Sequence, residues 1–287
     1  MASLQEFLER PIPRPLFWTA APLLAVVLTL TFVFLGFPYS DLIPAANNLS
    51  GANGVRIGEI QPRLTVGGPG FSVHRLSFGD GPMESVELDQ LTVRPAWTTS
   101  WLSGEPALAI RIRSPLGEAE GVLTWNEARH VKGQITIPDL AALPFPPDTS
   151  IALAGSMQAE VDLNIQNLTG NGPEGEIRFE ALAGSASHSN IPMPLEFETF
   201  SGRIELGSES GLTLEAMEID GPIFSAEVDG FVGLPEANRP ATMDLDFNLH
   251  VKNPALRMLL SGFGLGFDGG GRAIFNLGGT VQNPIVR

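Results

Sequence analysis

The sequence predicts a mainly β protein: a single N-terminal transmembrane helix followed by an elongated, curved and mostly antiparallel β-sheet domain. Two observations predict this fold class. The first is an uncharged apolar run over residues 16–37, and about 20 apolar residues suffice for a helix to cross the hydrocarbon core of a membrane. The second is that the rest of the chain alternates apolar and polar residues in short segments between Gly- and Pro-rich turns, which is typical of antiparallel sheet.

The apolar run divides the chain into three parts. Basic residues up to Arg14 precede it and the first charge after it is Asp41, so the positive-inside rule places the N-terminus in the cytoplasm. We therefore expect a cytoplasmic segment over residues 1–15, a membrane anchor over residues 16–37 and an extracytoplasmic β-rich domain over residues 38–287. A cleaved signal peptide, the alternative, has an apolar core of roughly 7–15 residues and a small-residue cleavage site, which fits this run less well.

The strands are predicted from alternation. Residues 243–252 alternate apolar and polar side chains without interruption, and residues 157–166 do the same. Residues 108–112 and 177–181 give shorter examples. A period of two buries one face of a strand and leaves the other in water. Because turn signals separate these segments at short intervals, we expect a meander of neighbouring strands.

Two kinds of irregularity interrupt this pattern. The alternation slips in phase within residues 86–93 and 212–219, and a β-bulge in each would restore the register and bend the sheet. We therefore expect a curved sheet or an open groove rather than a flat sandwich. Residues 97–103 and 256–262 have helical spacing and are predicted to form short helices that cap the sheet.

Charge and cysteine content exclude several classes of function. The net charge is −15, and the only two lysines, Lys132 and Lys252, have no basic neighbours. Nucleic-acid binding needs a concentrated basic face, so we exclude it. An acidic domain is also repelled by anionic headgroups, which leaves the helix as the membrane tether. The chain has no cysteine, which excludes disulfides, thiolate nucleophiles and lipidation of a cysteine.

The search for metal ligands predicts no metal site. None of the four histidines has the spacing that places two ligands on one helix face: His74, His130, His188 and His250. Asp244, Asp246 and His250 share one strand face and form the strongest metal hypothesis. The alternation of residues 243–252 already explains them as an exposed polar face, and this interpretation is preferred.

Catalytic and cofactor motifs are also not found. Ser187 beside His188 lacks an argued triad partner, and Glu196 and Glu198 share a strand face without any indication of a pocket. Glycines cluster within residues 262–271, but no Lys-Ser/Thr pair follows them, as a phosphate-binding loop requires. We therefore expect no catalytic residues, no cofactor and no enzymatic activity.

Inward-facing phenylalanines raise one further alternative. Five of them fall at apolar positions of predicted strands: Phe179, Phe197, Phe224, Phe247 and Phe275. An ordinary dry core is the preferred interpretation, because inward apolar residues are what any half-buried sheet has. The alternative is a continuous apolar lining that binds lipid.

The order of several short motifs carries a family resemblance. The motifs are residues 37–39 at the helix exit, then 54–57, 88–95, 101–104, 191–194, 200–204, 218–221, 229–230 and the closing 277–284. In this order and spacing they resemble the N protein of the type II secretion system (GspN) over nearly the whole chain. The closing Gly-Thr-Val-x-Asn-Pro and the Leu-Ser-Gly after residues 94–95 also resemble the AsmA-like proteins, whose β-grooves are associated with lipid transport.

These resemblances imply two functions. The first implies a single-span inner-membrane protein with a periplasmic domain, an accessory part of the machine that exports folded proteins across the outer membrane. Its partners are then other subunits of that machine, in the inner-membrane platform or the outer-membrane pore, and an exposed strand edge could pair with one of them. The second implies a periplasmic lipid-binding or lipid-transfer protein in outer-membrane biogenesis.

Overall fold

The protein consists of one helix at the N-terminus and one large β-sheet. The computed structural model describes residues 14–44, 47, 55–65, 67–78, 87–97, 104–125, 129–143, 151–165, 173–188, 193–207, 211–234, 240–262, 264–280 and 283–286. Helix α2 covers Arg14–Gly36 and is followed by the 3-10 turn η1, Tyr39–Leu42. The sheet carries two further short elements, the 3-10 turn η4, Leu140–Ala142, and helix α4, Pro254–Gly262.

Fourteen strands form the sheet in the order β1 to β14, and each strand pairs antiparallel with its neighbour in the sequence. The strands are β1 Val55–Thr65, β2 Gly68–Phe78, β3 Glu87–Pro95, β4 Ala107–Ser114, β5 Gly117–Thr124, β6 His130–Ile137, β7 Ile151–Asn164, β8 Glu174–His188, β9 Leu195–Leu206, β10 Gly211–Asp220, β11 Phe224–Gly233, β12 Thr242–Val251, β13 Arg272–Thr280 and β14 Asn283–Val286. The predicted antiparallel meander is confirmed.

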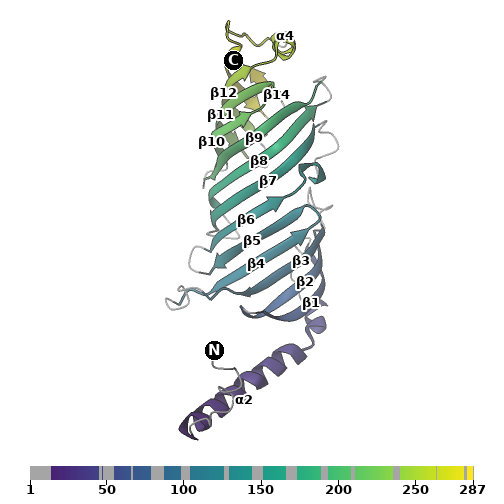
Figure 1. Ribbon diagram of the computed structural model, residues 1–287, viewed down its shortest axis with the longest axis vertical. Helices are drawn as coiled ribbons and strands as arrows, with labels where there is room; N and C mark the ends of the chain where they lie inside the picture. The colour runs from purple at the N-terminus through teal and green to yellow at the C-terminus, as the bar shows by residue number, and fades with distance from the viewer. Residues whose placement is uncertain are drawn as a thin grey trace, which may run out of the picture.

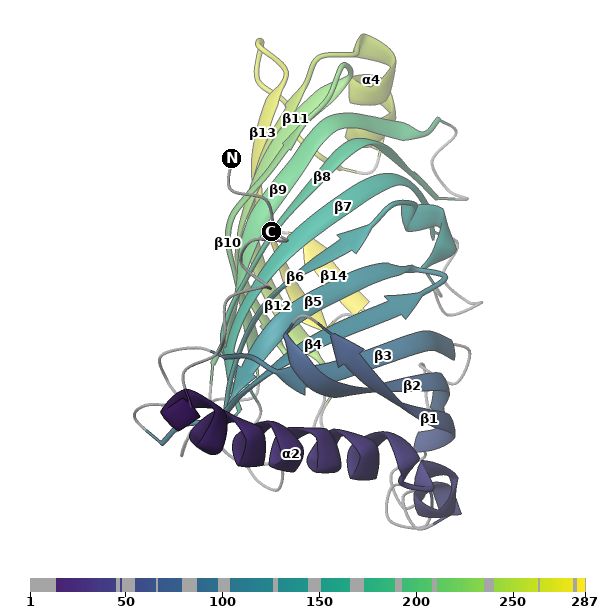
Figure 2. The same cartoon turned by 60° about the horizontal axis from the view of Figure 1, so that its bottom comes forward.

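The sheet is long and curled. In Figure 1 the strands succeed one another along the long axis, from β1 beside the end of α2 to β12–β14 at the far end. Figure 2 shows that the sheet curls along its length into a trough, with β1–β3 and β10–β13 on different sides. β1 and β14 each pair with one neighbour only, so the sheet is open. Each of these edge strands contains a proline, Pro62 and Pro284, as is common where an edge must resist further pairing.

Local irregularities lie at three places in the sheet. The register shifts between Leu214 and Met217 in β10, where Ala216 has a φ of +48°, which confirms the bulge predicted within residues 212–219. The bulge predicted within residues 86–93 is wrong for its strand, because the register of β3 is continuous and the positive φ belongs to Arg75 of β2. The register between β7 and β8 also shifts, near Ala154. These irregularities bend and twist the sheet.

Two buried clusters hold the short elements against the sheet. Leu256 of α4 is 2% exposed and packs with Phe224, Ala226 and Val251. Leu140 of η4 is 4% exposed and packs with Ala181 and Phe197. Asn253 begins α4, since its Oδ1 accepts the N–H of Ala255 at 2.8 Å, and a proline follows at the first helical position, which suits its missing donor.

The helix predictions have mixed outcomes. The helix expected over residues 256–262 is confirmed as part of α4. In the helix expected over residues 97–103, Trp97 is described and is not helical, and the other residues lie outside the described ranges. Gly104, which follows them, lies in a turn. α2 occupies the predicted anchor region, and its side chains are described from residue 24 onward. Within the described ranges, no helix is both long and apolar enough to span a membrane.

Candidate functional site

The strand register aligns apolar residues and glycines in rows across one side of the sheet. The longest row runs from β2 to β14 and consists of Phe71, Val93, Ile110, Gly121, Gly133, Val161, Ile177, Ile204, Leu214, Gly230, Leu245, Leu277 and Val286. A second row beside it contains Val73, Leu91, Ile112, Ala119, Ile135, Ala159, Phe179 and Gly202, and resumes with Val228, Phe247 and Phe275. Neither row contains a polar side chain. These two rows and the two buried clusters are called the apolar face.

The apolar face has no second sheet above it in the described part of the chain, where strands contact their neighbours in sequence and the two short elements cover only its margin. Side chains of the longest row are nevertheless half-buried from β2 to β13, whereas the polar residues between them are mostly exposed. In a single layer this difference arises because neighbouring apolar side chains shield one another, whereas longer polar side chains extend into water.

The five phenylalanines singled out in the sequence all belong to the apolar face. Phe247 and Phe275 are stacked with ring centroids 5.0 Å apart and an interplanar angle of 2°. The ring of Phe179 meets Phe200 edge-on at 5.0 Å, and Phe197 and Phe224 lie in the two buried clusters. Buried apolar residues thus gather in these clusters and at Ala159 and Val228 of the second row, and the other apolar side chains of the two rows are half-buried from β2 to β13.

An aromatic junction joins the apolar face to the end of α2. It consists of Phe34, Phe37, Tyr39 and Phe71. The ring of Phe71 lies 5.3 Å from Phe34 and 5.2 Å from Tyr39, centroid to centroid, and Phe37 contacts Tyr39 at 5.0 Å. The Tyr39 hydroxyl donates to the Phe34 carbonyl at 2.8 Å, which satisfies one of the free carbonyls at the helix end.

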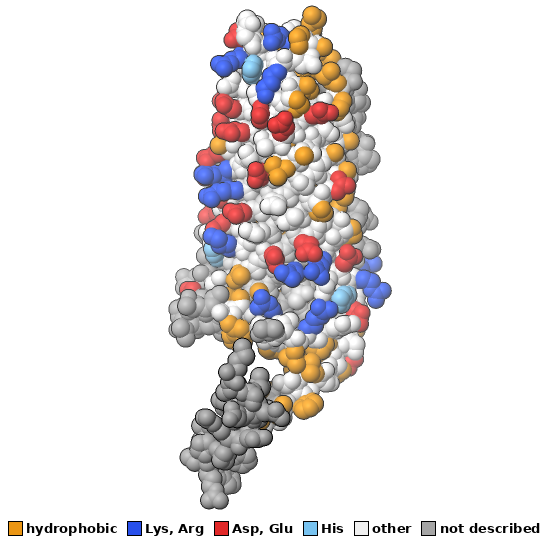
Figure 3. All heavy atoms as spheres, viewed as in Figure 1, with side chains coloured by type: hydrophobic (Ala, Val, Ile, Leu, Met, Phe, Trp, Pro, Cys, Tyr) orange, Lys and Arg blue, Asp and Glu red, His pale blue; other side chains and the backbone are white. Residues whose placement is uncertain are grey.

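The opposite side of the sheet, called the polar face, contains a hollow of about 1090 Å³ over β1–β8. Its lining includes Arg63, Gln90, Arg94, Arg111, Arg113, Glu120, Lys132, Gln134, Glu160, Asp162, Glu176 and Arg178. Charged side chains are spread along much of the surface in Figure 3. The charge balance changes along the chain: residues 55–137 carry eight Lys and Arg against nine Asp and Glu, whereas residues 138–287 carry seven against 20.

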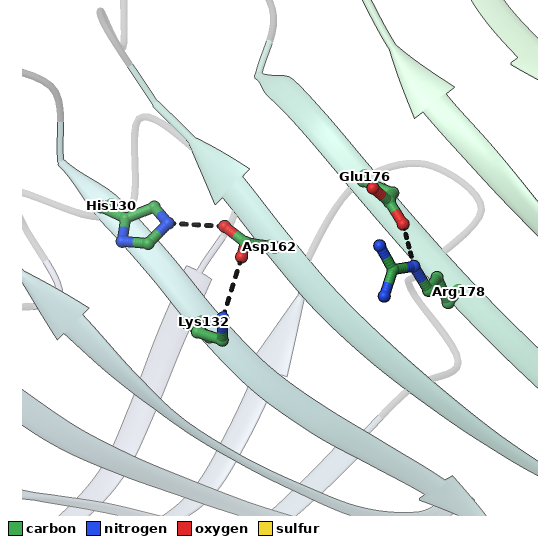
Figure 4. A network of polar contacts seen from close by, with 5 residues as sticks. All are labelled: His130, Lys132, Asp162, Glu176 and Arg178. Atoms are coloured by element: carbon green, nitrogen blue, oxygen red, sulfur yellow. Dashed lines mark hydrogen bonds and ion pairs between the residues drawn. The ribbon is translucent and has the colours of Figure 1, made fainter.

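Ion pairs line this hollow: Figure 4 shows His130 and Lys132 of β6 beside Asp162 of β7, and Glu176 beside Arg178 within β8. His130 Nε2 lies 2.5 Å from Asp162 Oδ1, and Lys132 Nζ lies 3.2 Å from Asp162 Oδ2. The hydrogen bond with His130, and next that from Lys132, lowers the pKa of Asp162. The hydrogen bond to Glu120 raises the pKa of Arg111. The side chains of these pairs are largely exposed, so each contributes little to stability, and their mutual pairing leaves few charges available for a ligand.

In the structure, the two carboxylates of the strongest metal hypothesis accept hydrogen bonds from a side-chain amide. Asn276 Nδ2 donates to Asp244 at 2.8 Å and to Asp246 at 3.1 Å. His250 lies opposite Arg272 on the next strand, not opposite an acidic residue. Across the described ranges, no three His, Asp or Glu side chains are placed to hold a metal ion. Asp244 and Asp246 are exposed on β12, and His250 on the same strand is half-buried.

The histidine and serine candidates have structural contacts instead. His74 Nε2 lies 3.2 Å from the hydroxyl of Ser72, a fully buried side chain. Ser187 donates to the Ala152 carbonyl at 3.4 Å, and the side chain of His188 lies outside the described residues.

The acidic and glycine candidates likewise form no site. Glu196 and Glu198 are both exposed on β9. In the glycine cluster, Asp268 accepts the N–H groups of Gly270 and Arg272 at 2.9 and 2.8 Å. These hydrogen bonds lower the pKa of Asp268, and they identify the cluster as a tight turn.

The sequence analysis did not predict the aromatic junction or the polar hollow. Two sequence features were available as signals for the junction: the aromatic residues at the helix exit, and the alternation that assigns Phe71 and Val73 to one face of a strand. Compared with protein-family models, with curated proteins and with solved structures, the chain has no match.

Proposed function

We propose that this protein is a non-enzymatic accessory component of the type II secretion system, anchored in the bacterial inner membrane with its sheet in the periplasm. The observation that carries this proposal is the open apolar face joined to an apolar helix. A contiguous apolar surface of this extent marks an interaction site. The ordered resemblance to the GspN family over nearly the whole chain supports the choice of machine.

The membrane anchor in this proposal is α2. Most of its large apolar side chains between Leu24 and Leu35 are exposed, with exposed fractions of 43–73%. These side chains need an apolar environment that the sheet does not supply. The uncharged run over residues 16–37 has the length of a spanning helix. The positive-inside rule orients the N-terminus to the cytoplasm and the sheet to the periplasm.

The contact with other subunits is proposed to use a face of the sheet rather than its edges. Pro62 and Pro284 remove a main-chain donor from each edge strand, and an edge without that donor is a poorer template for β-augmentation. An apolar face instead accepts the apolar side chains of a partner.

The test compares a deletion strain with two matched point variants. Phe247→Glu places a charge on the apolar face, and Phe231→Glu places one on the polar face of the neighbouring strand. We expect several-fold less secreted enzyme in the medium after deletion and with Phe247→Glu, normal secretion with Phe231→Glu, and unchanged membrane lipids. Immunoblots of membranes confirm that both variants accumulate. Intact secretion in the deletion strain would overturn the proposal.

A capture experiment identifies the partner. Tagged full-length protein is isolated from crosslinked native membranes, and the proteins in the eluate are identified by mass spectrometry. Enrichment of the inner-membrane platform or the outer-membrane pore supports the proposal. Enrichment of outer-membrane biogenesis factors without secretion subunits contradicts it.

A second candidate, an AsmA-like lipid-binding or lipid-transfer role, is favoured by one specific observation. The longest row of the apolar face runs from β2 to β14 without a polar side chain, and it is half-buried rather than fully exposed along β2 to β13. Such a lining solvates acyl chains. Lipid that co-purifies with the full-length protein, identified by mass spectrometry, supports this candidate, and lipid-free protein from the same membranes contradicts it.

A further inference from the structure

We infer that the aromatic junction is the entry by which acyl chains of membrane phospholipids pass from the bilayer around α2 onto the apolar face. This inference rests on the lipid-binding candidate and specifies its substrate class and its route. The junction is suited to the task because Phe34 belongs to the helix, Tyr39 to the turn after it, and Phe71 to β2. The three rings are in mutual contact, with centroids 5.2–5.9 Å apart.

Phe71 is also the first residue of the longest row. It is in register with Val93, which is in register with Ile110, and the row continues to the far end of the sheet. An acyl chain that leaves the side of α2 at Phe34 therefore meets apolar side chains from the helix to β14. At no step along this row does it pass a charged or hydrogen-bonding side chain.

The chemistry of the face selects an acyl chain over a peptide. A bound peptide must satisfy its backbone N–H and C=O groups, and leaving them unpaired against apolar side chains is unfavourable. The two rows offer no side-chain donor or acceptor for this purpose. An acyl chain has no such groups, so it binds the apolar face without leaving a hydrogen-bonding group unpaired.

The test uses full-length protein in vesicles of phosphatidylethanolamine and phosphatidylglycerol. A photoreactive benzoylphenylalanine at Phe247 reports lipid on the apolar face, far from the entry. The same group at Phe231 on the polar face is the matched control. After irradiation, lipid attached to the protein is measured by mass spectrometry. We expect at least a fivefold excess of lipid at Phe247 over Phe231.

The entry is then closed by Phe71→Asp in the protein carrying the probe at Phe247. We expect the lipid signal to fall at least fivefold. Phe231→Asp introduces the same charge on the polar face, where Phe231 is 43% exposed and outside the junction, so it should leave the signal unchanged. Protease resistance of the sheet controls for folding, and a probe placed at Phe71 itself should capture lipid whether or not Phe71→Asp folds.

The outcomes separate the two levels of the proposal. If the probe at Phe247 captures no more lipid than the probe at Phe231, the lipid-binding candidate and this inference both fail. If Phe247 captures lipid but Phe71→Asp has no effect and the probe at Phe71 captures none, the candidate stands and the aromatic junction is not the entry.

Discussion

The two faces of the sheet are built from alternate residues of the same strands, yet they differ in almost every physical respect. The side chains of the polar face are mostly exposed and form ion pairs such as Arg113–Glu118 at 3.1 Å. The apolar face is half-buried, with two clusters of fully buried side chains. The comparison teaches that buried apolar packing is concentrated on one side. Surface ion pairs contribute at most about 1 kcal/mol each, whereas burying one large apolar side chain contributes about 1.5–3 kcal/mol.

The largest difference between the faces is expected from phenylalanine truncation. Phe197→Ala removes a ring that is 8% exposed beside Leu140 and Ala181, and we expect the free energy of unfolding to fall by about 3–5 kcal/mol. Phe231→Ala on the polar face removes a ring that is 43% exposed, with an expected loss below about 1 kcal/mol. Urea unfolding of the detergent-solubilised protein measures both. Equal losses would mean that the faces do not differ in packing.

A smaller effect is expected from filling a glycine position in the longest row. Gly230 has a φ of +146°, and a Cβ there would lie 2.2 Å from the Asp244 carbonyl oxygen. Gly230→Ala should therefore cost about 1–3 kcal/mol, seen as a lower Tm. Gly266→Ala is the matched control, because its Cβ would meet no atom within 4 Å. If both variants melt together, β11 does not require glycine at this point.

On the polar face, the pH dependence of Asp162 sharpens the comparison. Its pKa is lowered from 3.8, chiefly by the hydrogen bond with His130 and then by that from Lys132. A lowered pKa gives stability that is present above pH 3.8 and lost as the pH falls through the lower folded-state pKa. Because the carboxylate is 48% exposed, the contribution is only about 0.5 kcal/mol.

The measurement compares Asp162→Asn with the original protein by urea unfolding at about pH 5 and about pH 2.5. We expect the variant to be less stable at the higher pH, with the difference shrinking at the lower pH. A difference that grows on acidification contradicts the assignment.

The smallest expected effect concerns Arg113 and Glu118, whose side chains are 49% and 56% exposed. A double-mutant cycle to alanine should give a coupling of about 0.2–0.5 kcal/mol, reduced further in about 0.5 M salt by screening. Chemical unfolding of the four proteins measures it. A coupling above about 1 kcal/mol would show that the polar face contributes more than its exposure implies.

Much of the fold could be predicted because its cause is local. The alternation of residues 243–252 gave β12, observed as Thr242–Val251, and it also assigned Asp244 and Asp246 to the polar face. The bulge near Ala216 was predictable from a phase slip. The slip within residues 86–93 was misassigned because the distortion lies in the neighbouring β2 at Arg75, and a sequence does not indicate which of two paired strands carries it.

The candidate site was only partly predictable. The five phenylalanines of the apolar face were identified, and the expectation of a dry core rested on the general half-burial of inward apolar residues. The aromatic residues of the junction are visible in the sequence, but the contact between Phe34 and Phe71 depends on the path of the chain between α2 and β2. The polar hollow similarly depends on strands from β1 to β8 lying side by side.

The sequence by itself determined the antiparallel meander, the apolar N-terminal run and the division of each strand into an apolar and a polar side, because the period-two pattern is a property of each segment alone. Only the tertiary structure decided how the segments align and curl. The register of fourteen strands converts separate alternations into rows that cross the sheet, and the described strands form a single layer with no second sheet against the apolar face. Both depend on pairing between segments, which no single segment encodes.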